Sequence, residues 1–261
     1  MPQALRHPDI MRIAQAEGLV TVERLAAHFD VTLQTIRRDL ADLAKTGALE
    51  RVHGGAVLPS GVSNIEYDER RRQNAGAKRR IAHACARLIP NDASVFLDIG
   101  TTAEAVARAL LRHRNLLVVT NNMHVAEILS GNDDCELVVT GGRLRRADKG
   151  LVGPLAVRTI ESFHFDYVVL GCSALTETGD MMDFDMDEVQ VSQALLGHAR
   201  EVILVGDASK FQRNAPVRIG SLKDVARFVT DRPLKADLSL RCTHWLTNVV
   251  VVDRLPIGVP I

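Results

Sequence analysis

From residue 94 onwards, short apolar runs alternate with segments of helical periodicity. Strands that are apolar along their whole length are typical of a parallel sheet covered by helices on both faces. We therefore expect residues 76–253 to form an α/β domain. The apolar runs are Val95–Leu97, Leu116–Val119, Leu137–Val139, Tyr167–Leu170 and Val202–Val205, with Val225–Val229 and Val249–Val252 as later candidates. The helical segments lie near residues 102–113, 122–130, 154–163 and 187–199.

The first 58 residues carry a different pattern, typical of three short helices and a hairpin. Thr21 and Thr32 stand at the expected N-caps of the second and third helices. The glycines of His53-Gly54-Gly55 predict a tight turn between two extended runs. Together these elements predict a winged helix-turn-helix. The expected boundaries are 1–58 for this domain, 59–75 for a linker, 76–253 for the α/β domain and 254–261 for a tail.

The net charge is zero, with 32 basic and 32 acidic residues. The first 58 residues also balance, at seven Lys or Arg against seven Asp or Glu. This argues against nonspecific nucleic-acid binding, so any DNA binding must depend on where the charges are placed.

Cysteine and histidine spacing gives no sign of a prosthetic group. The four cysteines include no CxxC pair and the nine histidines lack metal-ligand spacing, so we expect no disulfide, metal site or cofactor. No apolar run is long enough to span a membrane, and the N-terminus has no signal-peptide pattern. We therefore expect a cytoplasmic protein with no membrane partner.

The third predicted helix presents a polar face suited to reading DNA. On a helical wheel, Gln34, Thr35 and Arg38 point away from the apolar face. In the major groove, Arg bonds guanine with two hydrogen bonds and Gln bonds adenine. The alternative is the solvated face of a helix in a small bundle. The expected apolar face is Leu33, Ile36, Leu40 and Leu43. The candidate DNA contacts are Thr32, Gln34, Thr35, Arg37, Arg38, His53 and Gly54.

This segment also resembles a known family signature. The run Val31–Leu40 is followed by Leu43, Gly47, Leu49, Arg51 and His53–Ala56. The pattern is similar to that of the DeoR family of sugar-metabolism repressors, and the resemblance runs to about residue 232. It implies a repressor that binds double-stranded operator DNA as a homo-dimer or homo-tetramer.

Polar loops follow three of the apolar runs, at Asp98–Thr102, Thr120–Asn122 and Thr140–Gly142. Free amides and hydroxyls at a helix N-terminus bind anions, and the carboxyl ends of parallel strands meet at one edge of a sheet. The loops therefore predict a site for a phosphorylated small molecule. Their candidate residues are Asp98, Gly100, Thr101, Thr102, Thr120, Asn121, Asn122, Gly141 and Gly142.

Charged residues further along the chain are additional candidates. Asp183 and Glu188 can accept hydrogen bonds from ligand hydroxyls, and Lys210 can meet a phosphate. The alternatives are that Asp183 or Asp185 caps the following helix, and that Glu188 is solvated on its surface. For Arg145 we favour a surface role over phosphate binding.

The family resemblance implies an effector domain similar to ribose-5-phosphate isomerase that binds a phosphorylated sugar or polyol. Through the match of its loop residues, the resemblance also implies glycerol 3-phosphate as the effector, with fructose 1-phosphate or a deoxyribose phosphate as alternatives. A second alternative is a sugar-phosphate isomerase with an attached DNA-binding module, in which Asp183 or Glu188 is the base and Lys210 the electrostatic stabiliser. We favour the non-enzymatic repressor, because similarity of fold does not imply chemistry.

Overall fold

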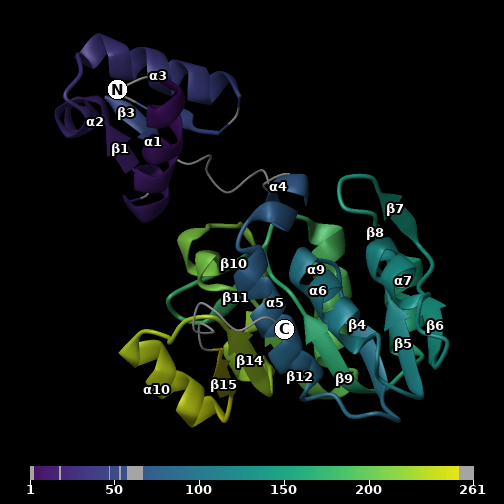
Figure 1. Cartoon of the computed structure of the whole chain (residues 1–261). Helices are drawn as coiled ribbons and strands as arrows, with labels where there is room; N and C mark the ends of the chain where they lie inside the picture. Colours follow the sequence, from purple (N-terminus) through teal and green to yellow (C-terminus); the bar gives the residue numbers. More distant parts are fainter. Residues whose placement is uncertain (1–2, 18, 47, 53, 58–66, 253–261) are drawn as a thin grey trace. The chain divides into compact units, whose positions relative to one another are not determined.

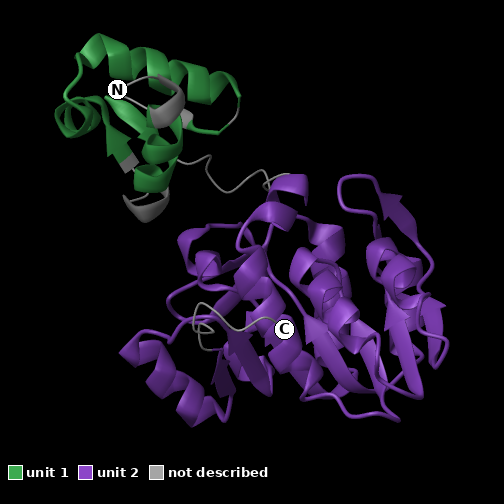
Figure 2. Cartoon of the chain, viewed as in Figure 1, with its two compact units in different colours: residues 1–63 green, residues 64–261 purple. Residues whose placement is uncertain are grey.

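The chain forms two compact units, residues 1–63 and 64–261 (Figure 2). The computed structural model describes residues 3–17, 19–46, 48–52, 54–57 and 67–252. The predicted DNA contact His53, residues 59–66 of the expected linker and the expected tail lie outside these ranges. Each unit has its own hydrophobic core.

Unit 1 is a helical cluster with a three-stranded sheet, ordered β1-β3-β2. The two predicted caps are confirmed: the Thr21 hydroxyl accepts from the Arg24 amide, and that of Thr32 from the Thr35 amide. Strand β1 was not expected; it pairs with β3 of the predicted hairpin. The elements are α1 (Gln3–Glu17), β1 (Leu19–Thr21), α2 (Val22–Phe29), α3 (Leu33–Lys45), β2 (Glu50–Val52) and β3 (Gly55–Val57).

The predicted apolar face of α3 needs one correction. Ile36, Leu40 and Leu43 are buried in the core of unit 1, but Leu33 is 42% exposed. Leu33 is the first residue of α3, so it precedes the turns of the helix that pack. Asp39, on the same helix, is buried, and Arg6 of α1 pairs with it.

Unit 2 is built on a seven-stranded parallel sheet (Figure 1). All the expected apolar runs contribute to it, including the two late ones. Across the sheet the strands are β15 (Asn248–Val251), β14 (Arg227–Thr230), β12 (Ala199–Val205), β9 (Phe165–Leu170), β4 (Ser94–Leu97), β5 (Leu116–Thr120) and β6 (Cys135–Val139).

Helices cover both faces of this sheet. Val95 and Leu97 pack in one core with α5, α6 and α7, whereas Phe96 between them packs in the other core with α8, α9 and α10. This follows from the alternation of side chains along a strand. The helices are α5 (Ala75–Ala86), α6 (Thr101–Leu110), α7 (Met123–Leu129), α8 (Pro154–Glu161), α9 (Met186–Leu196) and α10 (Ala236–Trp245). None of the helices among the described residues is both long and apolar enough to cross a membrane.

Smaller elements complete unit 2. Helix α4 (Tyr67–Arg72) and the start of α5 fall in the segment 59–75 that was expected to be a linker. The additional elements are an antiparallel sheet of β10 (Ala174–Leu175), β11 (Asp180–Asp183) and β13 (Val217–Ser221), a hairpin of β7 (Arg143–Arg145) and β8 (Gly150–Val152), and the short 3₁₀ helices η1 (Ala208–Gln212) and η2 (Leu222–Asp224).

The strand order reverses next to β4. From β4 the chain adds β5 and then β6 on one side, and later β9, β12, β14 and β15 on the other. In open parallel sheets, ligands bind at such a reversal, outside the carboxyl ends of the strands. The order therefore directs attention to the loops after β4, β9 and β12.

Candidate functional site

The exposed face of α3 carries several of the residues that the sequence analysis named as candidate DNA contacts. Gln34, Arg37 and Arg38 are exposed, and neither arginine forms an ion pair with another described residue. Thr32 and Thr35 are joined through their hydroxyls, at 2.9 Å, at the start of the helix. Two long cations and an amide thus project from one short helix, as major-groove readout requires.

Two contacts fix this helix and the hairpin beside it. Asp39 accepts from Arg6 Nε at 2.7 Å and from Nη2 at 3.1 Å, which ties α3 to α1. The Val22 amide donates to the Gly54 carbonyl at 2.9 Å, which ties the hairpin to the start of α2. Gly54 has a φ of +78°, a conformation that favours glycine, and is exposed at the tip.

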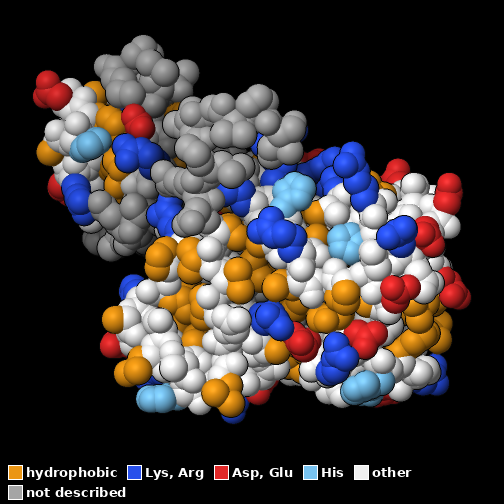
Figure 3. Space-filling view, turned by 60° about the horizontal axis from the view of Figure 1, so that its bottom comes forward, with side chains coloured by type: hydrophobic (Ala, Val, Ile, Leu, Met, Phe, Trp, Pro, Cys, Tyr) orange, Lys and Arg blue, Asp and Glu red, His pale blue; other side chains and the backbone are white. Residues whose placement is uncertain are grey.

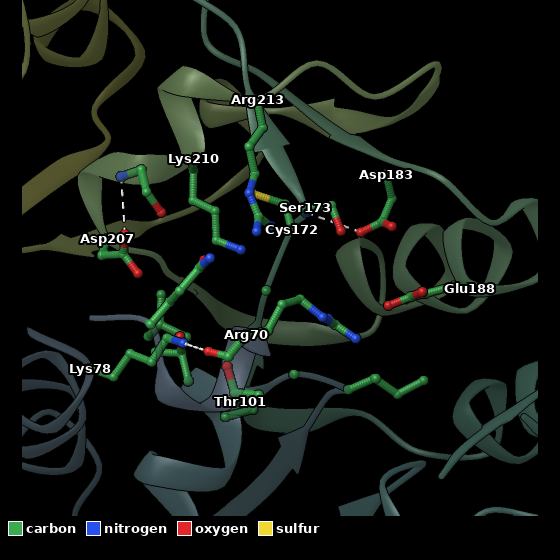
Figure 4. A pocket seen from close by; sticks show the side chains of 18 residues that line it. Arg70, Lys78, Thr101, Cys172, Ser173, Asp183, Glu188, Asp207, Lys210 and Arg213 are labelled. Carbon is green, nitrogen blue, oxygen red and sulfur yellow. Dashed lines mark hydrogen bonds between the residues drawn. The ribbon is translucent and has the colours of Figure 1, made fainter. Parts of the chain in front are cut away.

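A pocket in unit 2 lies at the strand-order reversal (Figure 4). It contains about 580 Å³ of empty space, including its opening to solvent. Its walls come from the loops after β4, β9 and β12, joined by α4, α5 and α9. The lining residues are Arg70, Gln73, Lys78, Ile99–Ala103, Gly171–Ser173, Asp183, Glu188, Val205, Asp207, Ser209, Lys210 and Arg213.

The N-terminus of α6 opens into this pocket through Gly100, Thr101 and Thr102. Gly100 is the N-cap, with a φ of +139°, and no side chain caps the first amides of the helix. Uncapped amides and the helix dipole favour an anion at this position. Here the predicted anion-binding loop lies in the pocket.

Four cations line the same pocket: Arg70, Lys78, Lys210 and Arg213. Burial lowers the pKa of Lys78 to about 8, and it lowers the pKa of Lys210 as well. For Lys210, the neighbouring charge of Arg213 adds to the effect. Lys78, Lys210 and Arg213 form no ion pair within the described chain, although the charge of Asp207 acts favourably on each of them. Figure 4 shows Lys210 and Arg213 pointing into the cavity.

Carboxylates line the opposite side. Asp183 accepts from the amides of Ser173 at 3.1 Å and Phe184 at 2.7 Å. Glu188 is buried rather than solvated, and burial raises its pKa against the opposing effect of Arg145. Of the alternatives for the start of α9, it is Asp185 that caps the helix, accepting from two of its amides.

Arg145 is the largest departure from expectation among the charged residues. Its side chain is 15% exposed, so it is not plain surface charge. Its Nη1 lies 2.5 Å from Glu188, while Nε and Nη2 bond the two oxygens of Asp148 at 3.0 and 2.5 Å. Asp148 belongs to the same hairpin as Arg145, whereas Glu188 comes from α9 and could not be paired with Arg145 from the sequence.

The other predicted ligand residues have structural contacts instead and do not line the pocket. The Thr120 hydroxyl donates to the Leu97 carbonyl, and Asn122 caps α7. A Cβ on Gly141 would lie 2.5 Å from Leu155, and one on Gly142 2.6 Å from the Val152 carbonyl oxygen. The remaining residues are Asn121, which is buried and bonds the Leu151 carbonyl, and Asp98, which is buried and accepts from Ser192.

Strand order explains this division. The loops after β5 and β6 leave the sheet on the far side of the reversal from β9 and β12. Conversely, Arg70 and Lys78 line the pocket although their segments precede the sheet in the chain. The only sequence signal for Lys78 is a cation on the buried side of an amphipathic helix.

Asp98, which does not line the pocket, is also affected by its surroundings. Burial of its carboxyl group raises the pKa of Asp98 to about 7.

The chain matches the DeoR-like helix-turn-helix domain over residues 6–62 and the DeoR C terminal sensor domain over residues 73–232. The chain belongs to the DeoR family. Relatives of this DeoR-family protein extend over nearly its whole length. It is 45% identical to the Glycerol-3-phosphate regulon repressor of Haemophilus influenzae, covering 88% of this chain and 90% of that one. It is 43% identical to the repressor of the same name from Escherichia coli, covering 89% of this chain and 92% of that one.

A further relative, the HTH-type transcriptional repressor CsqR of Escherichia coli, is 38% identical over 94% of each chain. The DeoR-family protein is therefore a DNA-binding transcriptional repressor, and the isomerase alternative is set aside. Ribose 5-phosphate isomerase A of Methanocaldococcus jannaschii aligns with 53% of the chain at 15% identity and a TM-score of 0.40, an overlap too small to support an argument.

On the face of unit 2 visible in Figure 3, basic and acidic side chains are interspersed. This agrees with the zero net charge of the chain.

Proposed function

We propose that this repressor leaves its operator when a small phosphate ester, with glycerol 3-phosphate the favoured candidate, binds in the pocket of unit 2. The observation that carries the proposal is the group of cations Lys78, Lys210 and Arg213, which lack ion-pair partners among the described residues, beside the uncapped N-terminus of α6. A phosphate ester at neutral pH carries close to two negative charges and several acceptor oxygens. It would compensate those cations and accept from the free amides.

The opposite side of the pocket supports a ligand that also carries hydroxyl groups. Asp183 and Glu188 line that side, and carboxylates accept hydrogen bonds from hydroxyls. A phosphate at one end and hydroxyls at the other describe a polyol or sugar phosphate. The similarity to two glycerol-3-phosphate regulon repressors supports glycerol 3-phosphate over other members of this class.

On the DNA side, α3 would enter the major groove of the operator with Gln34 and Arg38 facing base edges, while Thr32, Thr35 and Arg37 hold the backbone. The hairpin tip at Gly54 would approach a phosphate. Two or four copies would read a repeated operator. For release, the effector must bind more tightly to the weak-binding state, since equal affinity for both states shifts nothing.

A thermal-shift panel on the full chain tests the ligand class. Glycerol 3-phosphate, fructose 1-phosphate, deoxyribose 5-phosphate, inorganic phosphate and glycerol are compared at equal concentration. A ligand that binds only the folded state raises the apparent stability, by about 2.7 kcal/mol at a hundred times its Kd. We expect glycerol 3-phosphate to stabilise the protein more than either glycerol or inorganic phosphate does.

An operator titration tests the regulation. The DNA is a fragment selected by the protein from a random-sequence library. Millimolar glycerol 3-phosphate should weaken binding to this fragment. If the ligand stabilises the fold but leaves the affinity for DNA unchanged, it binds without acting as an effector. If fructose 1-phosphate alone releases the DNA, the effector is that alternative sugar phosphate.

A further inference from the structure

Arg70 occupies a particular place among the pocket cations. It lies on α4, the first described element of unit 2, directly after the segment that joins the two units. Its side chain is 13% exposed and lines the pocket with Thr101 and Lys210. Figure 4 shows the guanidinium extending across the pocket toward the side of Glu188. A residue of the connecting segment therefore contributes directly to the wall of the effector pocket.

The guanidinium of Arg70 is under-bonded where it lies. Its one described ion pair joins Nη2 to Asp148 Oδ2 at 3.4 Å, a long distance for a charge-assisted bond. Asp148 already accepts from Arg145 at both oxygens and from the Gly150 amide. Arg70 Nε is buried and has no hydrogen-bond partner among the described residues. A buried donor without a partner carries a desolvation cost that an anion would relieve.

Helix α4 is attached to unit 2 by polar contacts. None of its side chains is buried. The Tyr67 hydroxyl donates to Glu104 at 2.9 Å, and its ring stacks on His124 at 4.9 Å between centroids. The Lys78 ammonium donates to the Arg70 carbonyl. Such an attachment can shift without disturbing an apolar core, which a packed helix cannot do.

The joint between α4 and α5 is also tied to the pocket. Asn74, with a φ of +54°, makes the turn between the two helices. Its amide donates at 2.9 Å to Asp207, a lining residue that caps η1. The turn that follows α4 is therefore held by a residue of the pocket wall.

We propose that Arg70 is a ligand of the effector phosphate, and that binding draws it away from Asp148 and so shifts α4, the element through which the sensor unit joins the chain to the DNA-binding unit. This inference rests on the proposed function, since it requires a phosphate ester in the pocket. It adds the residue that reports binding. The competing view is that Arg70 only holds α4 in place through Asp148.

The two views make opposite predictions for a pair of substitutions. If Asp148 competes with the phosphate for Arg70, then Arg70→Gln weakens glycerol 3-phosphate binding and Asp148→Asn strengthens it. If the pair only holds α4, both substitutions remove the same contact and change the affinity in the same direction. Arg72→Gln is the matched control: it removes the same charge from the same helix, at an exposed residue that does not line the pocket.

The experiment uses the full chain and two measurements. Calorimetric titration gives the affinity for glycerol 3-phosphate. Titration of a DNA fragment selected by the wild-type protein gives its affinity for DNA with and without saturating glycerol 3-phosphate. For Arg70→Gln we expect at least tenfold weaker effector binding and less than a twofold effect of saturating effector on DNA affinity. Arg72→Gln should match the wild type in both, and Asp148→Asn should bind the effector several-fold more tightly.

Three results would count against the proposal. If Arg70→Gln binds the effector and leaves the DNA as the wild type does, the inference is overturned and the proposed function stands. The same holds if Arg70→Gln and Asp148→Asn both bind the effector more weakly. A wild-type protein that binds no sugar phosphate overturns the proposed function and this inference together. If Asp148→Asn does not fold, as judged by circular dichroism, hydrogen exchange of residues 67–72 in effector-free Arg70→Gln decides. Wild-type protection of α4 together with weak effector binding supports the ligand role, whereas faster exchange shows that Arg70 holds α4 in place.

Discussion

Arg6 and Asp39 form a two-bond ion pair inside the DNA-binding unit, with Nε–Oδ2 at 2.7 Å and Nη2–Oδ1 at 3.1 Å. Asp39 is 1% exposed, and His7 Nε2 lies 3.6 Å from its Oδ1. The pair joins the first helix of the unit to the helix that presents Gln34 and Arg38. It therefore fixes the orientation of α3 relative to α1, and with it the face that we propose reads DNA.

Arg6→Met should destabilise unit 1 by about 3 kcal/mol, because it leaves the buried Asp39 carboxylate without its main partner. Hydrogen exchange of peptides from residues 33–45 in the full chain measures this as faster exchange. Peptides from β4 and β9 in unit 2 are the internal control and should be unchanged. Unaltered protection in α3 would show that the ion pair contributes little.

Arg38→Ala should weaken binding to a selected DNA fragment by about 1–3 kcal/mol if Arg38 reads a base. The change should be smaller on random DNA, because only the selected site offers the matching base edge. Arg12→Ala is the control, since Arg12 is an exposed cation on α1. Equal losses on both DNAs would instead identify Arg38 as a phosphate contact.

The two hairpin glycines should respond differently to alanine. A Cβ on Gly55 would lie 2.1 Å from the Val20 carbonyl oxygen, so Gly55→Ala must separate β1 from β3. A Cβ on Gly54 meets nothing within 4 Å, so Gly54→Ala costs only the left-handed backbone, about 1 kcal/mol. In thermal unfolding of the full chain, Gly55→Ala should therefore have a clearly lower unfolding temperature than Gly54→Ala. Equal stability would mean that β1 can move away at no cost.

Effector affinity should fall as the pH rises above 8. Burial lowers the pKa of Lys78 from 10.5 to about 8, with Asp207 opposing and Lys210 adding to the effect. In the ligand-free protein, Lys78 is therefore charged at pH 7 and largely neutral at pH 9. A bound phosphate stabilises the charged ammonium and so keeps Lys78 protonated. Above pH 8 this linkage weakens binding by up to about tenfold per pH unit, and the phosphate itself, with a second pKa near 6, stays dianionic.

Calorimetric titration of glycerol 3-phosphate at pH 7, 8 and 9 checks this expectation. Lys78→Met should bind glycerol 3-phosphate more weakly at pH 7, and its affinity should depend much less on pH. The pH dependence that remains is the contribution of Lys210. The same slope in Lys78→Met and the wild type would show that the phosphate does not lie beside Lys78.

Local patterns were sufficient for much of the fold. The capping threonines, the apolar strands and the α6 loop are each encoded within a few neighbouring residues, so Thr32 and Gly100 could be placed from the sequence. The order of strands in the sheet is not local. Without it, the loops at Thr120 and Gly141 looked equivalent to the one at Gly100, although they leave the sheet on the far side of the reversal.

Long-range ion pairs were the other limit. Arg145 is interpreted as surface charge from the sequence, because its partner Glu188 lies on the distant helix α9. Lys78 and Arg70 line the pocket only because α4 and α5 fold against the loops of a sheet that follows them in the chain. Residues of this kind are fixed by tertiary structure, and no spacing in the sequence marks them.

The family match to the sensor domain ends at residue 232, but the sheet does not. Strand β15 pairs with β14 along its whole length, and α10 adds Leu238 and Cys242 to the core beneath. A fragment cut at 232 would expose the backbone of β14 and the apolar surface around Phe228, a template for association between chains. The sensor-domain match therefore ends about twenty residues before the last strand of the sheet that the domain builds.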